Sequence, residues 1–145
     1  MQGLPPAMVR EIRDRCLCLA TQRAARRLAQ RFDRLFAPLG ITNGQFSMLV
    51  ALSGDWKPRL GELATFLAMD SATMTAAART LEKNGLIVVL TDAADARIRR
   101  PQLTDAGRRT VEKAEPLWRA EHARLDAELG GTDGASIAAQ LQRLR

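Results

Sequence analysis

The order of short elements in the middle of the chain constrains the fold more than any other feature. The stretch LGELATFLA (60–68) predicts a short helix, and SATMTAAARTLEKN (71–84) predicts a second helix, capped by Asp70 or Ser71, after a tight connection. Gly85 ends that helix, and the β-branched run LIVVL (86–90) predicts a strand that returns through PQL (101–103). Two helices joined by a tight turn and followed by a hairpin predict a winged helix-turn-helix.

A long helix is predicted before this central region. Residues 8–38 have no Gly or Pro in their interior, and apolar side chains recur there at steps of three and four, so one continuous helix is expected. Thr42 follows Gly40 and is expected to cap a further helix that ends near Leu52. The apolar side of that helix is predicted to consist of Phe46, Leu49 and Val50.

Helices are predicted after the central region too. Thr104 is expected to cap a helix to about Leu129, the stretch GGTDG (130–134) breaks it, and residues 135–145 form a final helix. The first and last helices carry apolar stripes that a small winged region cannot cover, so we expect them to pack in a two-fold homodimer. The stripes comprise Ile12, Cys16, Leu19, Leu117, Leu125, Leu129, Ile137, Leu141 and Leu144.

The expected organisation is one mostly α domain over residues 1–145. Dimerisation helices at 8–38 and 105–145 enclose a winged helix region at 42–104. No stretch approaches the roughly 20 apolar residues that span a bilayer, and no signal-peptide pattern precedes the first charges. A cytoplasmic protein without membrane contact is therefore expected.

The chain offers few residues for catalysis or metal binding. Its two cysteines, Cys16 and Cys18, and its one histidine, His122, lack the spacing of a zinc site. If residues 8–38 form one helix, the two cysteines point to different sides and cannot crosslink. No Gly-rich phosphate loop and no nucleophile–base pair is present. We therefore expect no enzyme activity, no metal and no other cofactor.

Four stretches form an ordered set: LGITNGQFSMLVAL (39–52), LGELATFLAMDSATMTAAARTLEKNGLI (60–87), DAADAR (92–97) and LTDAGR (103–108). Together they resemble the MarR (multiple antibiotic resistance regulator) family. The resemblance implies a homodimeric transcription regulator that binds double-stranded DNA, and we expect a repressor with a palindromic operator rather than an activator. It places the helix at 71–84 in the major groove and the hairpin tip in the minor groove. It also implies release by a small aromatic effector. The net charge of +6 permits such a polyanionic partner.

The resemblance makes the start of the second helix a candidate DNA contact. Ser71, Thr73 and Thr75 carry short hydroxyls that can bond phosphates or base edges, and Arg79 lies on the same helix. The alternatives are that the hydroxyls cap the helix and that Arg79 forms a surface ion pair. The run of alanines at 76–78 shortens the reach of this helix, so much of the affinity must come from elsewhere.

The hairpin tip is the expected second source of affinity. By the resemblance, Arg97 enters the minor groove, and Ala96 replaces the arginine that usually precedes it. Asp95 could hold the Arg97 guanidinium in a forked ion pair, and a narrow A·T-rich groove attracts such an arginine. Arg99 is expected to approach phosphate, whereas Arg100 receives no predicted role. The alternative is a hairpin whose charges are simply solvated.

A ligand site is expected where the dimerisation helices meet the winged region. The stretch at 10–34 holds eight arginines against three acidic residues, which forms either a solvated helix face or a site for an anion. Aromatic and methionine side chains nearby could line a pocket, although at helical spacing they also suit a plain core. These candidates are Phe32, Phe36, Phe46, Met48 and Trp56.

Two alternatives to a ligand-responsive repressor remain open. Cys18 lies at the position that resembles the reactive cysteine of the family's organic-hydroperoxide sensors, so it could sense oxidants. Those sensors use nearby tyrosines, whereas this chain has no tyrosine and carries Gln22 and Phe32 at the corresponding places. The second alternative is an interaction module that keeps the fold without DNA binding, which the alanine run at 76–78 favours.

Overall fold

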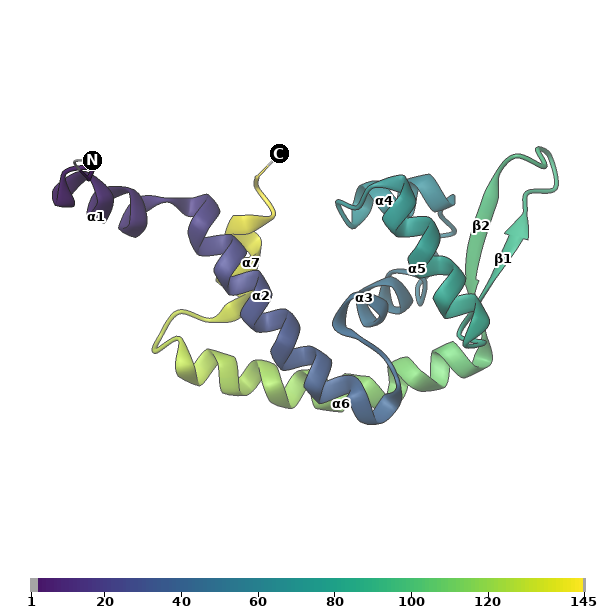
Figure 1. The fold of residues 1–145 in the computed structure, drawn as a ribbon. Coiled ribbons are helices and arrows are strands. Elements are labelled where there is room, and N and C mark those ends of the chain that lie inside the picture. Colours follow the sequence, from purple (N-terminus) through teal and green to yellow (C-terminus); the bar gives the residue numbers. More distant parts are fainter. Residues whose placement is uncertain (1–2, 145) are drawn as a thin grey trace.

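Helices make up most of the structure, a computed structural model that describes residues 3–144 (Figure 1). Within these residues the sheet is one antiparallel pair in which Ile87 pairs with Leu103 and Thr91 with Arg99. The predicted class, mostly α with a winged helix-turn-helix, is confirmed. The elements are α1 (Pro6–Arg15), α2 (Leu17–Phe36), the 3-10 turn η1 (Ala37–Leu39), α3 (Asn43–Ala51), α4 (Leu60–Phe66), α5 (Ser71–Lys83), β1 (Ile87–Thr91), β2 (Arg99–Leu103), α6 (Asp105–Glu128) and α7 (Gly134–Leu141).

Side-chain caps start the helices where the sequence predicts them. Thr42 Oγ1 accepts a hydrogen bond from Gln45 N at 3.2 Å, and Gln45 Oε1 accepts one from Thr42 N at 3.0 Å. This pair is a complete capping box, which satisfies two free N–H groups at the start of α3. Asp70 caps α5 and Thr104 caps α6 through the same kind of bond. The predicted starts of these helices are therefore confirmed.

The prediction of one continuous helix over residues 8–38 is wrong. The chain leaves helical geometry at Cys16, whose φ of −73° and ψ of 102° separate α1 from α2. The Cys16 Sγ accepts a hydrogen bond from Leu19 N at 3.3 Å, so the thiol caps α2. Cysteine is a weak helix former, and α1 buries no residue. Packing within the chain therefore does not hold α1 in line with α2.

Two further helix predictions need correction. Helix α7 starts at Gly134 and ends at Leu141, whereas a helix was expected over 135–145, of which position 145 lies outside the described residues. On α3, Met48 is buried while Val50 is 45% exposed. Positions two apart on a helix face different sides. Val50 therefore does not belong to the buried side of α3, and the prediction that it does is wrong.

The hydrophobic core lies where α2, α3, α4, α5 and α6 meet the base of the hairpin. Close packing there fixes the helix-turn-helix against α6, because well-packed cores allow little displacement. The most deeply buried apolar side chains are Phe36, Met48, Leu49, Pro58, Leu63, Met74, Leu81, Ile87, Pro101 and Ala114.

Helix α6 joins two parts of the molecule (Figure 1). One end of α6 continues from β2 below the winged region, which we define as α3 to β2. The other end lies beside α2 and α7, and we define the helical arm as α1, α2, α6 and α7. Helix α1 extends away from the rest of the chain. None of the helices described is long and apolar enough to cross a membrane.

Candidate functional site

The turn between α4 and α5 sets the direction of α5. Ala68 has a φ of 52°, in the left-handed region that residues other than Gly seldom adopt. Ala68 N donates to Thr65 O at 3.1 Å, and Met69 N donates to Ala64 O at 2.8 Å. These two bonds form a Schellman motif that closes α4. The chain therefore reverses within a few residues and begins α5 at the surface.

Helix α5 turns one side to the core and the other to solvent. The buried side consists of Met74, Ala78 and Leu81. Lys83 is exposed one turn after Arg79 and was not predicted as a contact. The spacing of four residues indicates that the two side chains share one side of the helix. Of the four predicted contact residues on α5, Thr75 is half-buried and three are exposed: Ser71, Thr73 and Arg79.

Two of the predicted hydroxyl groups already donate hydrogen bonds inside the chain. Thr73 Oγ1 donates to Asp70 Oδ2 at 2.6 Å, and Thr75 Oγ1 donates to Ser71 O at 2.8 Å. The bond from Thr73 lowers the pKa of Asp70 and so favours the ionised carboxylate that caps α5. Thr73 thus belongs to the helix cap in the free protein. Arg79 has no ion-pair partner among residues 3–144, so its guanidinium is available.

The tip of the hairpin presents Arg97 to solvent. Its side chain is 91% exposed, and its Nε and Nη2 donate to the two oxygens of Asp95 at 3.1 and 3.0 Å. The predicted forked ion pair is therefore confirmed. The hydrogen bond from Arg97 lowers the pKa of Asp95. An ion pair this exposed contributes little to stability, so Arg97 can leave Asp95 for a more negative surface.

The structure brings the hairpin arginines next to both helices of the helix-turn-helix. Arg97 and Arg99 line a notch of about 410 Å³ with Arg59, which immediately precedes α4; we call this the wing notch. Arg99 also lines a crevice with Thr75 and Arg79 between α5 and the hairpin. Sequence reasoning missed Arg59, because only tertiary packing places it beside the hairpin tip. A continuous surface thus contains predicted contact residues from α5 and from the hairpin.

An aromatic groove of about 320 Å³ lies between α2, α3 and α6. The Phe36 ring centroid lies 4.6 Å from that of Phe46 and 5.8 Å from that of Phe32. Three of the predicted ligand-site residues therefore meet around one groove. The full lining is Ala25, Leu28, Ala29, Phe32, Phe36, Asn43, Phe46, Ser47, Trp118 and His122.

The other predicted ligand or redox residues lie elsewhere. Met48 is buried beneath a separate groove between α3 and α5, and Trp56 does not line the aromatic groove either. Cys18 is exposed near the start of α2, and Gln22 Nε2 donates to its Sγ at 3.1 Å. Neither Cys18 nor Gln22 lines the aromatic groove. The prediction that Cys16 and Cys18 cannot crosslink assumed that both lie on one helix. Cys16 lies between α1 and α2, so that assumption does not hold.

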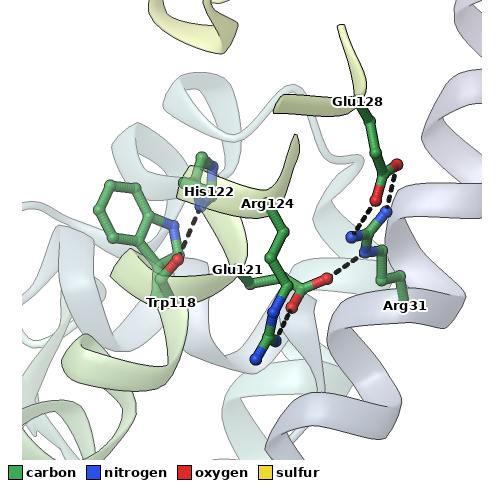
Figure 2. A network of polar contacts seen from close by, with 6 residues as sticks. All are labelled: Arg31, Trp118, Glu121, His122, Arg124 and Glu128. Carbon is green, nitrogen blue, oxygen red and sulfur yellow. Dashed lines mark hydrogen bonds and ion pairs between the residues drawn. The ribbon is translucent and has the colours of Figure 1, made fainter. Parts of the chain in front are cut away.

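Trp118 and His122 complete the aromatic groove from α6, and the sequence analysis missed both as ligand-site residues. Their ring centroids are 4.1 Å apart, and His122 Nδ1 lies 3.0 Å from Trp118 O (Figure 2). The His122 ring also lies 5.2 Å from Phe32 on α2. Their spacing of four residues indicated one helical face, but nothing in the sequence placed that face against Phe32.

Arg31 connects α2 to α6 through two carboxylates (Figure 2). It pairs with Glu121, and its Nη1 and Nη2 donate to the oxygens of Glu128 at 2.8 and 2.7 Å. Arg124 Nη1 also donates to Glu121 Oε2 at 2.7 Å. The Glu121 side chain is only 8% exposed, and the bond from Arg31 lowers its pKa. Part of the arginine-rich stretch at 10–34 is therefore neutralised within the chain.

A second, larger groove of about 510 Å³ lies between α2, α6 and α7, and we call it the interhelical groove. Its walls are mainly apolar, and its charged lining residues are Arg27, Arg31 and Glu128. Exposed apolar side chains continue beyond it along the helical arm. They include Leu4, Met8, Val9, Ile12, Leu17 and Leu144.

Comparison with known proteins connects this geometry to a family. The MarR family model matches residues 41–98, which cover most of the winged region. A DNA complex of the transcriptional regulator MosR of M. tuberculosis is 37% identical, with a TM-score of 0.79 over 89% of this chain and 92% of that chain. The chain belongs to the MarR family. The predicted family and the predicted DNA-binding, winged helix transcription regulator are thereby confirmed.

Other transcription regulators share the fold of this MarR-family chain. The repressor CouR, solved with a 23-mer DNA duplex, is 30% identical with a TM-score of 0.78 over 98% of this chain and 100% of that chain. CouR has also been solved with p-coumaroyl-CoA. BpsR of Bordetella bronchiseptica, whose DNA binding is regulated by 6-hydroxynicotinic acid, is 28% identical with a TM-score of 0.64 over 86% of this chain and 89% of that chain. No curated protein sequence matches the chain.

Proposed function

We propose that this MarR-family regulator is a homodimeric repressor that binds a palindromic operator and releases it when a small effector binds. The observation that best supports DNA binding is the continuous surface that joins the exposed side of α5 to the wing notch. Three arginines line that notch, and phosphate neutralisation by such side chains supplies much of the affinity for DNA. The DNA complexes of MosR and CouR support the proposal.

The proposed contacts divide into two groups. On α5, Ser71 and Arg79 donate to the major groove, while Thr73 and Thr75 offer oxygen lone pairs and methyl groups, because their hydroxyl protons are already bonded. At the hairpin, Arg97 enters the minor groove and Arg99 approaches phosphate. Arg59 joins them at the wing notch. The short alanine side chains of α5 make the arginines the main source of affinity.

The proposed dimer forms through the helical arm, which corresponds to the dimerisation helices expected at 8–38 and 105–145. Helix α1 buries nothing within its own chain, and its apolar side faces solvent. The interhelical groove is also mainly apolar. We therefore place the apolar side of α1 of one subunit against the interhelical groove of its partner. A two-fold dimer presents two copies of α5 to major-groove segments about 34 Å apart.

A binding experiment tests this proposal. A duplex selected from a random-sequence library by the wild-type chain should contain an inverted repeat, and it should bind two chains in a gel shift. Its affinity should fall roughly a thousandfold between 50 and 200 mM salt, because several phosphates are neutralised. If no sequence is enriched and binding depends little on salt, the chain is an interaction module instead.

The aromatic groove is the proposed effector site. Two compounds with a planar ring serve as probes of this site: 6-hydroxynicotinic acid and p-coumaroyl-CoA, the ligands of BpsR and CouR. A probe that releases the selected duplex should lose this effect in Ser47→Trp, because an indole at this exposed position fills the groove. Val50→Trp adds the same ring on the same helix outside the groove and should respond as wild type. Equal responses of both variants would place the effector elsewhere.

A thiol switch is the second candidate, since Cys18 is exposed and Cys16 caps α2. In the same gel shift, hydrogen peroxide would release the duplex from wild type, and this effect would be lost in Cys18→Ser. If peroxide leaves binding unchanged, or if Cys18→Ser still responds, Cys18 is not the sensor.

A further inference from the structure

Arg100 lies differently from its neighbours in the wing. Whereas Arg97 and Arg99 are exposed, the Arg100 side chain is only 29% exposed. Its Nε donates to Asp92 Oδ2 at 2.7 Å, and its Nη1 donates to Lys57 O at 2.8 Å. One guanidinium thus joins the second strand, the wing loop and the connection that precedes α4. We call this set of bonds the Arg100 clasp.

We propose that Arg100 is a positioning residue that holds the wing at a fixed angle to the helix-turn-helix, so that Arg97 reaches the DNA. This inference rests on the proposed role of Arg97. The clasp is the first part of a chain of bonds that leads to the wing tip. Asp92 Oδ1 accepts from Asp95 N at 3.2 Å, and Asp95 in turn holds the Arg97 guanidinium.

The hairpin needs such an anchor for two reasons. A two-stranded hairpin is only marginally stable by itself, and this one carries a long loop from 92 to 98. Pro101, which follows Arg100 in β2, has no N–H to donate to the strand pair. Lys57 precedes the buried Pro58, so the carbonyl that receives Arg100 belongs to a well-packed segment. The clasp therefore ties a weak hairpin to a rigid part of the fold.

Two variants break the clasp at opposite ends. Arg100→Leu removes the guanidinium and keeps an apolar stem in the strand. Asp92→Asn removes the charge that faces Arg100, while its Oδ1 can still accept from the Ala94 and Asp95 N–H groups that shape the turn. Arg99→Leu is the matched control, because it removes the same charge from an exposed neighbouring position.

Hydrogen exchange tests the clasp without DNA. The amides of Asp92 and Ile98, which donate across the wing loop, should exchange roughly fivefold faster in Arg100→Leu and in Asp92→Asn, as expected for loss of a partly buried ion pair. The α5 amides should be unaffected, and Arg99→Leu should match wild type in the wing. Wild-type exchange in both clasp variants would overturn the proposal, whatever happens with DNA.

Binding to the selected duplex tests the consequence for Arg97. Arg100→Leu should weaken binding roughly tenfold with an unchanged salt slope, whereas a lost phosphate contact would lower the slope by about 0.9 per subunit. The double variant of Arg97→Ala and Arg100→Leu should lose less affinity than the product of the two single fold-losses, because a displaced wing already misplaces Arg97. A lowered slope or fully multiplied losses would overturn the positioning role. Wild-type binding by Arg97→Ala alone would instead refute the proposed Arg97 contact.

Discussion

Arg97→Ala is expected to weaken binding to the selected duplex roughly a hundredfold at moderate salt, because a dimer loses one minor-groove arginine at each half-site. The fold should not change, since the Arg97 side chain is 91% exposed and its one ion-pair partner among residues 3–144 is Asp95 in the same loop. A competition gel shift measures the loss of affinity, and circular dichroism checks that helix content and melting temperature stay at wild-type values.

The sequence preference gives this prediction a second readout. A narrow A·T-rich minor groove attracts an arginine more strongly than a wide one. Replacing the A·T pairs that flank each half-site with G·C should therefore weaken wild type more than Arg97→Ala. Arg119→Ala is the matched control, because Arg119 is an exposed arginine on α6 that pairs with Glu115 of the same helix. If Arg97→Ala binds as tightly as this control, Arg97 does not enter the minor groove.

Gly107→Ala is expected to destabilise the protein by about 2–4 kcal/mol, although alanine is the better helix former by about 1 kcal/mol. A Cβ at position 107 would lie 2.1 Å from Leu86 O and 2.7 Å from Leu103 Cδ1. Leu86 O cannot move away freely, because it accepts a hydrogen bond from Thr104 N at 3.1 Å. Overpacking against backbone therefore outweighs the gain in helix propensity.

Thermal and urea unfolding measure this effect. The melting temperature of Gly107→Ala should fall by roughly 10 °C, at a protein concentration equal to that of wild type, because a dimer's stability depends on concentration. Gly44→Ala is the control: this glycine lies in the first turn of α3, and its added Cβ would meet nothing within 4 Å. Gly44→Ala should be neutral or slightly stabilising. A Gly107→Ala protein as stable as wild type would contradict the close contact of α6 with the hairpin.

Local rules account for the parts of the fold that could be predicted. The caps at Thr42, Asp70 and Thr104 act on N–H groups two or three residues away, so the sequence contains all the information that they need. The Arg97–Asp95 pair lies within one short loop and was predicted for the same reason. The break at Cys16 was missed because no Gly or Pro marks it, and because no residue of α1 is buried.

The sequence by itself determined the family, the order of the elements, the helix starts and the exposed arginine of the wing. Only the tertiary structure placed Arg59 beside Arg97, brought Trp118 and His122 against Phe32, and paired Arg100 with the Lys57 carbonyl. The partners in each of these sets are far apart along the chain. Which of them meet depends on how the helices pack around the core, and neither periodicity nor capping encodes that packing.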